Sequence, residues 1–124
     1  MEIEGYFDEG KPMIGICLEG SEDPIDVLVD TGFNGELMLT KDKIEELSLT
    51  LIGDDEYMTA SGDMVPTTVH MGFIKWFGHT RKIAVLATFG KANLIGMELL
   101  HFYRLDIARS QNLLIIDECN HLAL

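Results

Sequence analysis

The sequence is poor in basic residues, and this deficit argues against one large class of partners. Nine Lys and Arg residues stand against 21 Asp and Glu residues, which gives a formal net charge of −12. Such a chain repels a phosphate backbone, so we expect no nucleic-acid binding. Residues 1–62 hold 16 of the acids and only 3 of the bases. This acidic half is either a solvated surface that keeps the protein in solution or a surface that prefers basic peptides.

Cysteine is scarce, and histidine is too widely spaced to suggest a metal site. Cys17 and Cys119 have no Cys-x-x-Cys spacing, which argues against a zinc knuckle or a redox motif and favours buried thiols. Successive histidines lie 9, 22 and 20 residues apart, at positions His70, His79, His101 and His121. Such separations do not bring imidazoles onto one ion by helical or hairpin spacing. We therefore expect no metal ion and no cofactor.

Long apolar runs are lacking as well, and the chain is short. The longest uninterrupted runs, such as residues 83–87, have only a few residues, and the N-terminus is acidic where a signal peptide would be basic. We expect a cytoplasmic protein without membrane association. With 124 residues, 47% of them apolar, the chain has room for one domain over residues 1–124 and one core. A site made from two lobes would therefore need two chains.

The order of apolar runs and turn residues predicts a mainly β fold with two short helices. A hairpin is expected over residues 3–18, with its turn at Gly10-Lys11-Pro12, and a second one joins residues 56–60 to 64–71 through Ser61-Gly62-Asp63. Further strands are expected at residues 25–29, 36–39, 73–77, 83–88 and 113–116. The helices are expected at residues 41–47, capped by Thr40, and at residues 97–103.

Methionine and tryptophan side chains are expected in the core. Most methionines fit this interpretation, although Met58 and Met64 on the second hairpin could instead face a substrate. Trp76 falls within an expected strand and is interpreted as a packing residue.

Three features along the chain point to a specific chemistry. Asp30-Thr31-Gly32 ends an apolar strand, the glycine-centred hairpin at Ser61-Gly62 follows, and Leu94-Ile95-Gly96 comes later. Asp-x-Gly alone is an ordinary turn. In this order and spacing, however, residues 25–116 resemble the retropepsin-like (clan AA) aspartic proteases, the single-domain, dimeric relatives of pepsin and the retroviral proteases.

The resemblance implies a closed, mostly β acid-protease barrel and assigns a role to each matched residue. Asp30 would be the catalytic carboxylate, Thr31 would hydrogen-bond across the twofold axis of a homodimer, and Gly32 would leave space for the substrate backbone. Residues 59–67 would form the flap over the substrate, with Ser61 and Gly62 near its tip. Leu94-Ile95-Gly96 would support the catalytic loop from behind.

Two departures from the family pattern concern the substrate. Phe33 stands where the family favours Ala or Ser, and its ring either narrows the substrate subsites or packs beneath them. The flap is also less rich in glycine than in the viral relatives.

The implied chemistry needs two carboxylates. Peptide hydrolysis without a metal or a covalent nucleophile requires a base that activates water and an acid that protonates the carbonyl oxygen. Two carboxyl groups that share one proton perform both tasks. The chain has one Asp-Thr-Gly, so the second carboxylate would be Asp30 of a symmetry-related copy, in a C2 homodimer that cleaves peptide or protein substrates.

Other interpretations of the same residues stay open. The chain could be a noncatalytic, dimeric binding or scaffolding domain with a retropepsin-like fold. It could also be an unrelated β-barrel in which Asp30 only caps a turn, and Ser61-Gly62 could belong to an ordinary hairpin.

Overall fold

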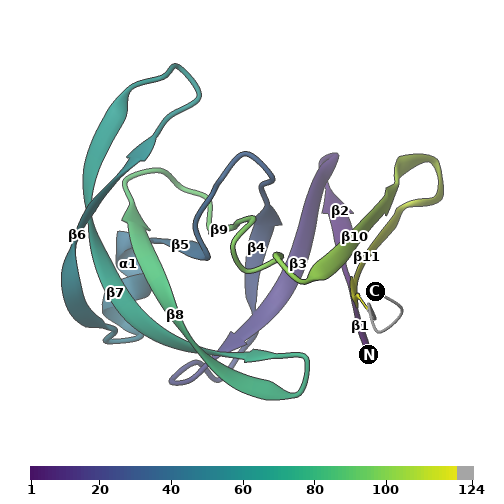
Figure 1. Cartoon of the computed structure of the whole chain (residues 1–124), viewed down its shortest axis with the longest axis horizontal. Helices are drawn as coiled ribbons and strands as arrows, with labels where there is room; N and C mark the ends of the chain where they lie inside the picture. The colour runs from purple at the N-terminus through teal and green to yellow at the C-terminus, as the bar shows by residue number, and fades with distance from the viewer. Residues whose placement is uncertain (120–124) are drawn as a thin grey trace.

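The computed structural model describes residues 1–119, and most of them lie in β-strands (Figure 1). The strands are β1 (Glu2–Glu4), β2 (Tyr6–Asp8), β3 (Lys11–Leu18), β4 (Ile25–Val29), β5 (Leu37–Thr40), β6 (Thr50–Met58), β7 (Met64–Trp76), β8 (His79–Thr88), β9 (Leu94–Ile95), β10 (Tyr103–Ala108) and β11 (Leu113–Glu118). The helices are α1 (Lys41–Glu46) and the 3-10 helix η1 (Arg109–Gln111). None of the described helices is long and apolar enough to cross a membrane.

The larger of two sheets closes on itself and forms a barrel. Its strand order is β2-β3-β4-β9-β5-β8-β7-β6, and β3 also pairs with β7. In that additional pairing Cys17 lies opposite Lys75 and Leu18 lies opposite Ile74. Strands β3, β4, β9, β5, β8 and β7 therefore form a closed ring, while β2 and β6 lie outside it. The predicted closed, mainly β barrel is confirmed.

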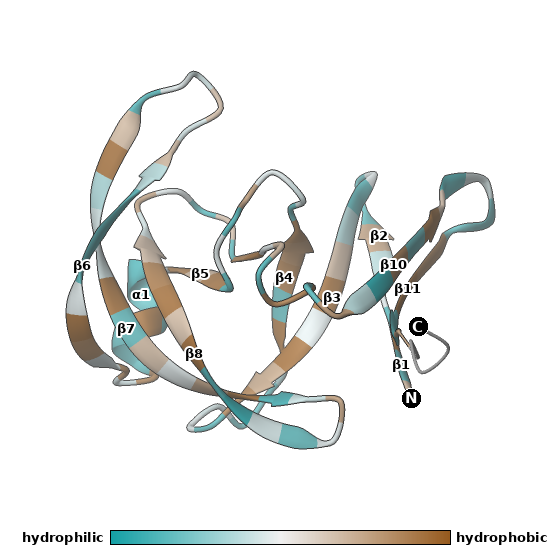
Figure 2. Ribbon diagram, viewed as in Figure 1, coloured by the Kyte–Doolittle hydropathy of each residue, from teal (hydrophilic) through white to brown (hydrophobic). Residues whose placement is uncertain are grey.

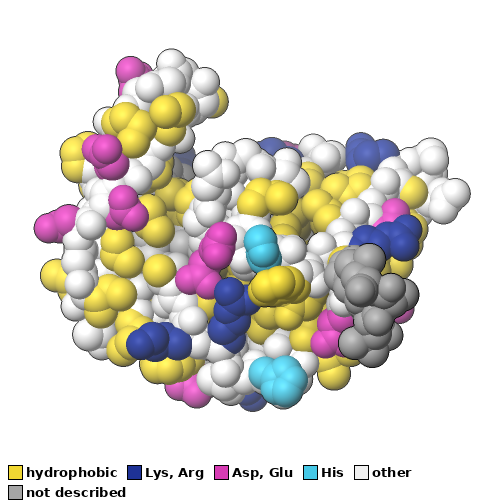
Figure 3. All heavy atoms as spheres, in the orientation of Figure 1, with side chains coloured by type: hydrophobic (Ala, Val, Ile, Leu, Met, Phe, Trp, Pro, Cys, Tyr) yellow, Lys and Arg dark blue, Asp and Glu magenta, His cyan; other side chains and the backbone are white. Residues whose placement is uncertain are grey.

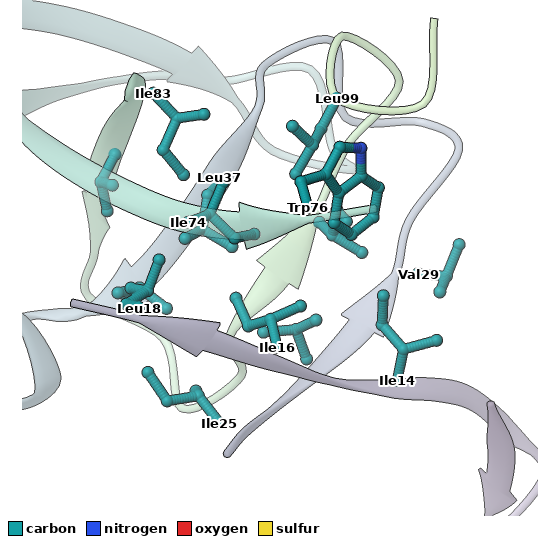
Figure 4. Close-up of a cluster of buried hydrophobic side chains, with 14 of the residues drawn as sticks. Ile14, Ile16, Leu18, Ile25, Val29, Leu37, Ile74, Trp76, Ile83 and Leu99 are labelled. Atoms are coloured by element: carbon teal, nitrogen blue, oxygen red, sulfur yellow. The ribbon is translucent and has the colours of Figure 1, made fainter. Parts of the chain in front are cut away.

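Alternating side chains fill the interior of this barrel. Ile14, Ile16 and Leu18 of β3 are buried, whereas the residues between them are exposed. Figure 4 shows these side chains gathered with Ile74 and Trp76 of β7. The apolar residues are distributed over several strands of the ring (Figure 2). Each fully buried aliphatic side chain contributes about 1.5–3 kcal/mol to stability. A shift of one residue in the pairing of a strand would turn its buried side chains outward, so the alternation fixes the register of the ring.

The second sheet is small and joins the two ends of the described chain. Its strand order is β1-β11-β10, with Ile3 opposite Ile116. Gly5 separates β1 from β2, and a Cβ atom at this position would overlap the side chain of Leu114. The predicted N-terminal hairpin is therefore formed by β2 and β3 alone, with its turn at Glu9 and Gly10, because β1 leaves it to pair with β11.

The second predicted hairpin extends beyond the barrel. Strands β6 and β7 pair from Thr50 opposite Met71 to Met58 opposite Met64, and almost every residue of β6 is exposed. Figure 1 shows this hairpin (teal) rising from one side of the barrel and curving at its tip. The strand expected at residues 56–60 begins earlier, at Thr50. The strands expected at residues 64–71 and 73–77 are one continuous strand, β7.

The first predicted helix is confirmed, and the second prediction is wrong. Helix α1 follows Thr40, whose hydroxyl oxygen accepts a hydrogen bond from the Lys43 amide at 3.2 Å. Residues 97–102 form consecutive turns instead of a helix, and β10 begins at Tyr103. Leu99 and Leu100 are both buried, and the Leu100 and Tyr103 amides donate to carbonyls three residues earlier, as in successive turns. The ring of Tyr103 stacks on Phe77 with centroids 4.4 Å apart, which holds β10 against the barrel.

The expected burial of cysteine and methionine is wrong in part. Cys17 is exposed and Cys119 is half-buried, because the alternation along β3 turns Cys17 outward. Met58, Met64 and Met97 are exposed. Trp76 is buried and packs edge-on against neighbouring aromatic rings, as predicted.

Candidate active site

The loop between β4 and β5 carries the Asp-Thr-Gly sequence and is held at both ends by one peptide group. The Asp30 amide donates a hydrogen bond to the Ile95 carbonyl at 3.0 Å, and the Gly96 amide donates one to the Glu36 carbonyl, also at 3.0 Å. The Ile95 carbonyl and the Gly96 amide belong to the same planar peptide unit. The loop is therefore fixed at its first and last residues by a single rigid group.

Strand β9 places this peptide group behind the loop. It lies between β4, with which it pairs in parallel, and β5, with which it pairs antiparallel. Leu94 lies opposite Leu28, and Ile95 lies opposite both Val29 and Leu37. The structure thus brings Leu94-Ile95-Gly96 and Asp30 together, although 63 residues lie between Asp30 and Leu94 in the sequence.

The Asp30 carboxylate is oriented by its own loop. Its Oδ1 atom accepts a hydrogen bond from the Gly32 amide at 2.9 Å, and the Asp30 carbonyl accepts one from the Phe33 amide at 3.2 Å. These bonds hold an aspartate turn at the end of β4. Within residues 1–119, Asp30 forms no ion pair, and its side chain is half-buried. The carboxylate is thus positioned without being neutralised by a described base.

Thr31 and Gly32 lie on the exposed side of the loop. No hydrogen bond of the Thr31 hydroxyl is found within the described part of the chain, and the residue is exposed. A Cβ atom at Gly32 would lie 3.3 Å from Asp30 Oδ1, a contact tighter than most real Cβ contacts. A side chain at residue 32 would therefore crowd the carboxylate.

Phe33 folds back onto two glycines. A Cβ atom at Gly35 would lie 2.5 Å from Phe33 Cζ, and one at Gly96 would lie 2.5 Å from Phe33 Cδ2. The Phe33 carbonyl also accepts a hydrogen bond from the Met97 amide at 2.8 Å. The ring of Phe33 thus packs between the loop and the segment after β9, and the residue is half-buried.

The tip of the β6–β7 hairpin is closed by its own polar groups. The Thr59 amide donates to the Asp63 carbonyl at 2.8 Å, and the Ser61 hydroxyl donates to the Asp63 carboxylate at 3.1 Å. Gly62 has a φ of +91°, a left-handed conformation that favours glycine. No described hydrogen bond joins Ser61 or Gly62 to the Asp30 loop. Figure 3 shows the hairpin standing away from the body, with open space beside it.

The register of the hairpin separates its two faces. Met58 lies opposite Met64, Glu56 lies opposite Pro66, and these pairs share a face because side chains alternate along a strand. Pro66 also lines a cavity of about 370 Å³ shared with α1. The opposite face carries Tyr57 and Val65, which are half-buried.

Sequence reasoning did not distinguish the two faces of this hairpin. Alternation within residues 56–60 and 64–71 could have separated Tyr57 and Val65 from Met58 and Met64.

Metal ligands do not gather in the described part of the chain. Within residues 1–119, no three His, Cys, Asp or Glu side chains are arranged to hold an ion. His121, one of the four histidines considered above, lies outside the described residues.

The fold is similar to that of two solved proteases. No protein-family model and no curated protein matches the sequence. A retropepsin-like aspartic protease from Rickettsia conorii superposes with a TM-score of 0.67 at 23% identity, over 95% of this chain and 89% of that one. EIAV protease complexed with an inhibitor superposes with a TM-score of 0.64 at 22% identity, over 77% of this chain and 90% of that one. The closed barrel and the loop that β9 supports are therefore a retropepsin-like fold.

Proposed function

We propose that this protein is an aspartic endopeptidase that acts as a homodimer, with Asp30 of each protomer supplying one of two catalytic carboxylates. The observation that carries the proposal is the way in which the Asp30 loop presents its carboxylate. The loop presents one oriented carboxylate, held at both ends by the Ile95–Gly96 peptide and free of a described ion pair. The retropepsin-like fold and its similarity to two proteases support the same assignment.

In the proposed reaction, the two carboxyl groups share one proton. The ionised carboxylate takes a proton from a water molecule while the protonated one donates to the oxygen of the scissile carbonyl, so that water adds to the carbonyl carbon. The dyad then takes a proton from one hydroxyl of the resulting tetrahedral diol as the C=O bond re-forms, the C–N bond breaks, and the nitrogen leaves with a proton from the dyad. The products are a carboxylic acid and an amine, and the dyad regains its single shared proton.

A twofold axis beside the loop accounts for the second carboxylate. The chain contains a single Asp-Thr-Gly, and a C2 dimer places the same loop of two copies against each other. In this arrangement the exposed Thr31 hydroxyl forms a hydrogen bond with the same loop of the other protomer. Gly32 keeps the approach to the carboxylates open, since a side chain there would crowd Asp30.

The projecting hairpins complete the proposed cleft. Each protomer contributes one β6–β7 hairpin, whose tip residues Ser61 and Gly62 lie over the bound peptide. The half-buried Phe33 borders the same loop and contacts the substrate with the part of its ring that remains accessible. The substrate is an extended peptide segment of a protein or an oligopeptide.

The variant Asp30→Asn tests the proposal, with Asp23→Asn as the matched control. Asparagine keeps the shape of the side chain and the acceptor for the Gly32 amide but removes the base. Asp23 lies in an exposed loop, where the described hydrogen bond uses only its carbonyl. Each protein is incubated with a denatured-protein or random-peptide mixture between about pH 4 and 7, where a carboxylate pair can share a proton. Cleavage is followed by mass spectrometry, and dimerisation by sedimentation.

We expect Asp30→Asn to lower kcat/KM by about 10²–10⁴-fold, the usual contribution of general acid–base catalysis, while the dimer persists. Asp23→Asn is expected to cleave like the unmodified protein. Undiminished turnover by Asp30→Asn would contradict the proposal. A dimer of the unmodified chain that cleaves nothing would instead indicate a binding or scaffolding domain.

A further inference from the structure

The side chain of Glu36 anchors the end of the Asp30 loop to strand β8. Its Oε1 atom accepts a hydrogen bond from the Ala84 amide at 2.9 Å, and its Oε2 atom accepts one from the Arg81 guanidinium at 3.1 Å. The Glu36 side chain is 18% exposed, the lowest value among the acidic partners in the described ion pairs. Both carboxylate oxygens are therefore engaged, one by the backbone and one by a base.

The position of Glu36 in the sheet explains why a carboxylate is needed there. Strand β5 begins at Leu37, which lies opposite Val85 in the parallel pairing with β8. Before Leu37 the chain turns away into the loop, so β5 offers no further carbonyl to the next amide of β8. The Glu36 side chain supplies the acceptor for that amide. Removing it leaves the Ala84 amide, in a half-buried strand position, without its partner.

A short path connects this anchor to the catalytic carboxylate. The Glu36 carbonyl accepts a hydrogen bond from the Gly96 amide, and the Ile95 carbonyl accepts one from the Asp30 amide. Because the Ile95 carbonyl and the Gly96 amide form one planar peptide unit, a rotation of that unit displaces Glu36 and Asp30 together. Glu36 is therefore two backbone hydrogen bonds and one rigid group away from Asp30.

We propose that Glu36 is a positioning residue for Asp30, acting through its bond to the Ala84 amide and the Ile95–Gly96 peptide, and that Arg81 fixes the orientation of its carboxylate. This inference rests on the proposed function. An exposed ion pair alone would have little effect, because water and salt screen the attraction between its charges. The bond to a strand amide distinguishes Glu36 from such a pair.

The test compares E36A, which removes both contacts, with E36Q, which keeps an acceptor for the Ala84 amide. R81M retains a long side chain but removes the charge, and E46A is the matched control. Glu46 forms an ion pair with Lys43 on α1, and its side chain is 64% exposed. For each protein, kcat and KM are measured, and amide hydrogen exchange at Asp30 and Gly96 is followed by NMR.

We expect E36A to lower kcat at least tenfold while KM changes less than threefold, since a displacement of about 1 Å in a catalytic group can cost 10²-fold. Exchange at the Asp30 and Gly96 amides should accelerate at least tenfold. The kcat of E36Q is expected to lie within about threefold of the value for the unmodified protein. E46A should match the unmodified protein in both the kinetic and the exchange measurements. This pattern separates positioning from substrate binding, which would raise KM.

Wild-type exchange rates in E36A would overturn the inference. A loss in E36A that appears only in KM, or an equal loss of kcat in E36Q, would also overturn it. If E36A does not fold, E36M decides, because it keeps a side chain of similar length but no carboxylate acceptor for the Ala84 amide. Faster exchange at the Asp30 amide of E36M supports the anchor, and unchanged exchange contradicts it. R81M keeps the bond to the Ala84 amide, so its Asp30 amide should exchange more slowly than that of E36M. If the unmodified protein cleaves no peptide, the proposed function fails on its own, while the exchange measurement still decides whether Glu36 holds the Asp30 loop.

Discussion

The ring of Phe33 occupies the space in which a side chain at Gly96 would lie. A Cβ atom at residue 96 would come within 2.5 Å of Phe33 Cδ2 and would also overlap the Gly35 carbonyl oxygen. The backbones of the two segments are also in contact, because the Met97 amide donates a hydrogen bond to the Phe33 carbonyl. Residues 33 and 96 therefore depend on each other, because the Phe33 ring fits in its position only when residue 96 is a glycine.

The first prediction follows from this contact. Gly96→Ala should lower the free energy of unfolding by about 1–3 kcal/mol, the usual cost of forcing an extra carbon into a packed site. Chemical denaturation measures the change. Gly53→Ala is the control, because a Cβ atom there meets nothing within 4 Å, and it should change stability by less than about 0.5 kcal/mol. Equal stability of the two variants would show that both the Phe33 ring and the Gly35 carbonyl move aside without cost.

A second prediction concerns Thr31 in the proposed dimer. Thr31→Ala should weaken dimerisation by about tenfold or more, because two symmetric hydrogen bonds of about 1 kcal/mol each are lost. Thr31→Ser keeps the hydroxyl and should dimerise like the unmodified protein. Sedimentation equilibrium gives the dissociation constants. If the alanine variant dimerises as tightly as the serine variant, the hydroxyl does not join the two loops.

A third prediction is a bell-shaped dependence of kcat/KM on pH. One carboxylate of the dyad must be ionised and the other protonated, so activity should fall when both are protonated and again when both are ionised. The profile should therefore decline as the medium becomes alkaline, while light scattering shows that the dimer persists. Activity that rises through about pH 8 would assign the reaction to a different base.

A fourth prediction concerns Tyr6, whose hydroxyl faces two carboxylates. The hydrogen bond to Asp26, with desolvation and the charges of Asp26 and Asp8, raises the pKa of Tyr6 from 10.0 to about 12. The folded state favours the protonated phenol, so this contact stabilises the fold below about pH 10, and its contribution is lost as the pH rises through about 12. The difference between tyrosinate absorbance titrations of the unmodified protein and Tyr6→Phe isolates this residue.

The difference curve for Tyr6 should have its midpoint well above 10. In a second pair, Asp26→Asn and its Tyr6→Phe double variant, the midpoint should move back toward the ordinary value. A midpoint near 10 in the unmodified protein would show that Tyr6 and Asp26 do not bond in solution.

Local patterns were sufficient for part of the fold. The strand at residues 25–29 and the Thr40 cap of α1 were predicted correctly, because a short β-branched run and a hydroxyl cap act through neighbouring residues. The segment at residues 97–103 was not, although its composition favours a helix. The Met97 and Glu98 amides bond instead to the carbonyls of Phe33 and Gly35, contacts that join distant parts of the chain.

Within the candidate site, motifs located Asp30 but gave no information about its supports. Glu36 was not identified, because its role depends on the parallel pairing of β5 with β8, and no local signal specifies which strands become neighbours. The exposure of Cys17 could have been predicted from alternation along β3. A residue-type preference for burial led to the opposite expectation.

The stoichiometry of inhibitor binding tests most directly whether one active site is built from Asp30 of two protomers. A peptide analogue that carries a tetrahedral hydroxyl group in place of the scissile carbonyl mimics the intermediate and binds the dyad more tightly than substrate. Calorimetric titration should give one analogue per two chains, with affinity at least 10²-fold weaker for Asp30→Asn. One analogue per chain, or equal affinity for Asp30→Asn, would contradict the account.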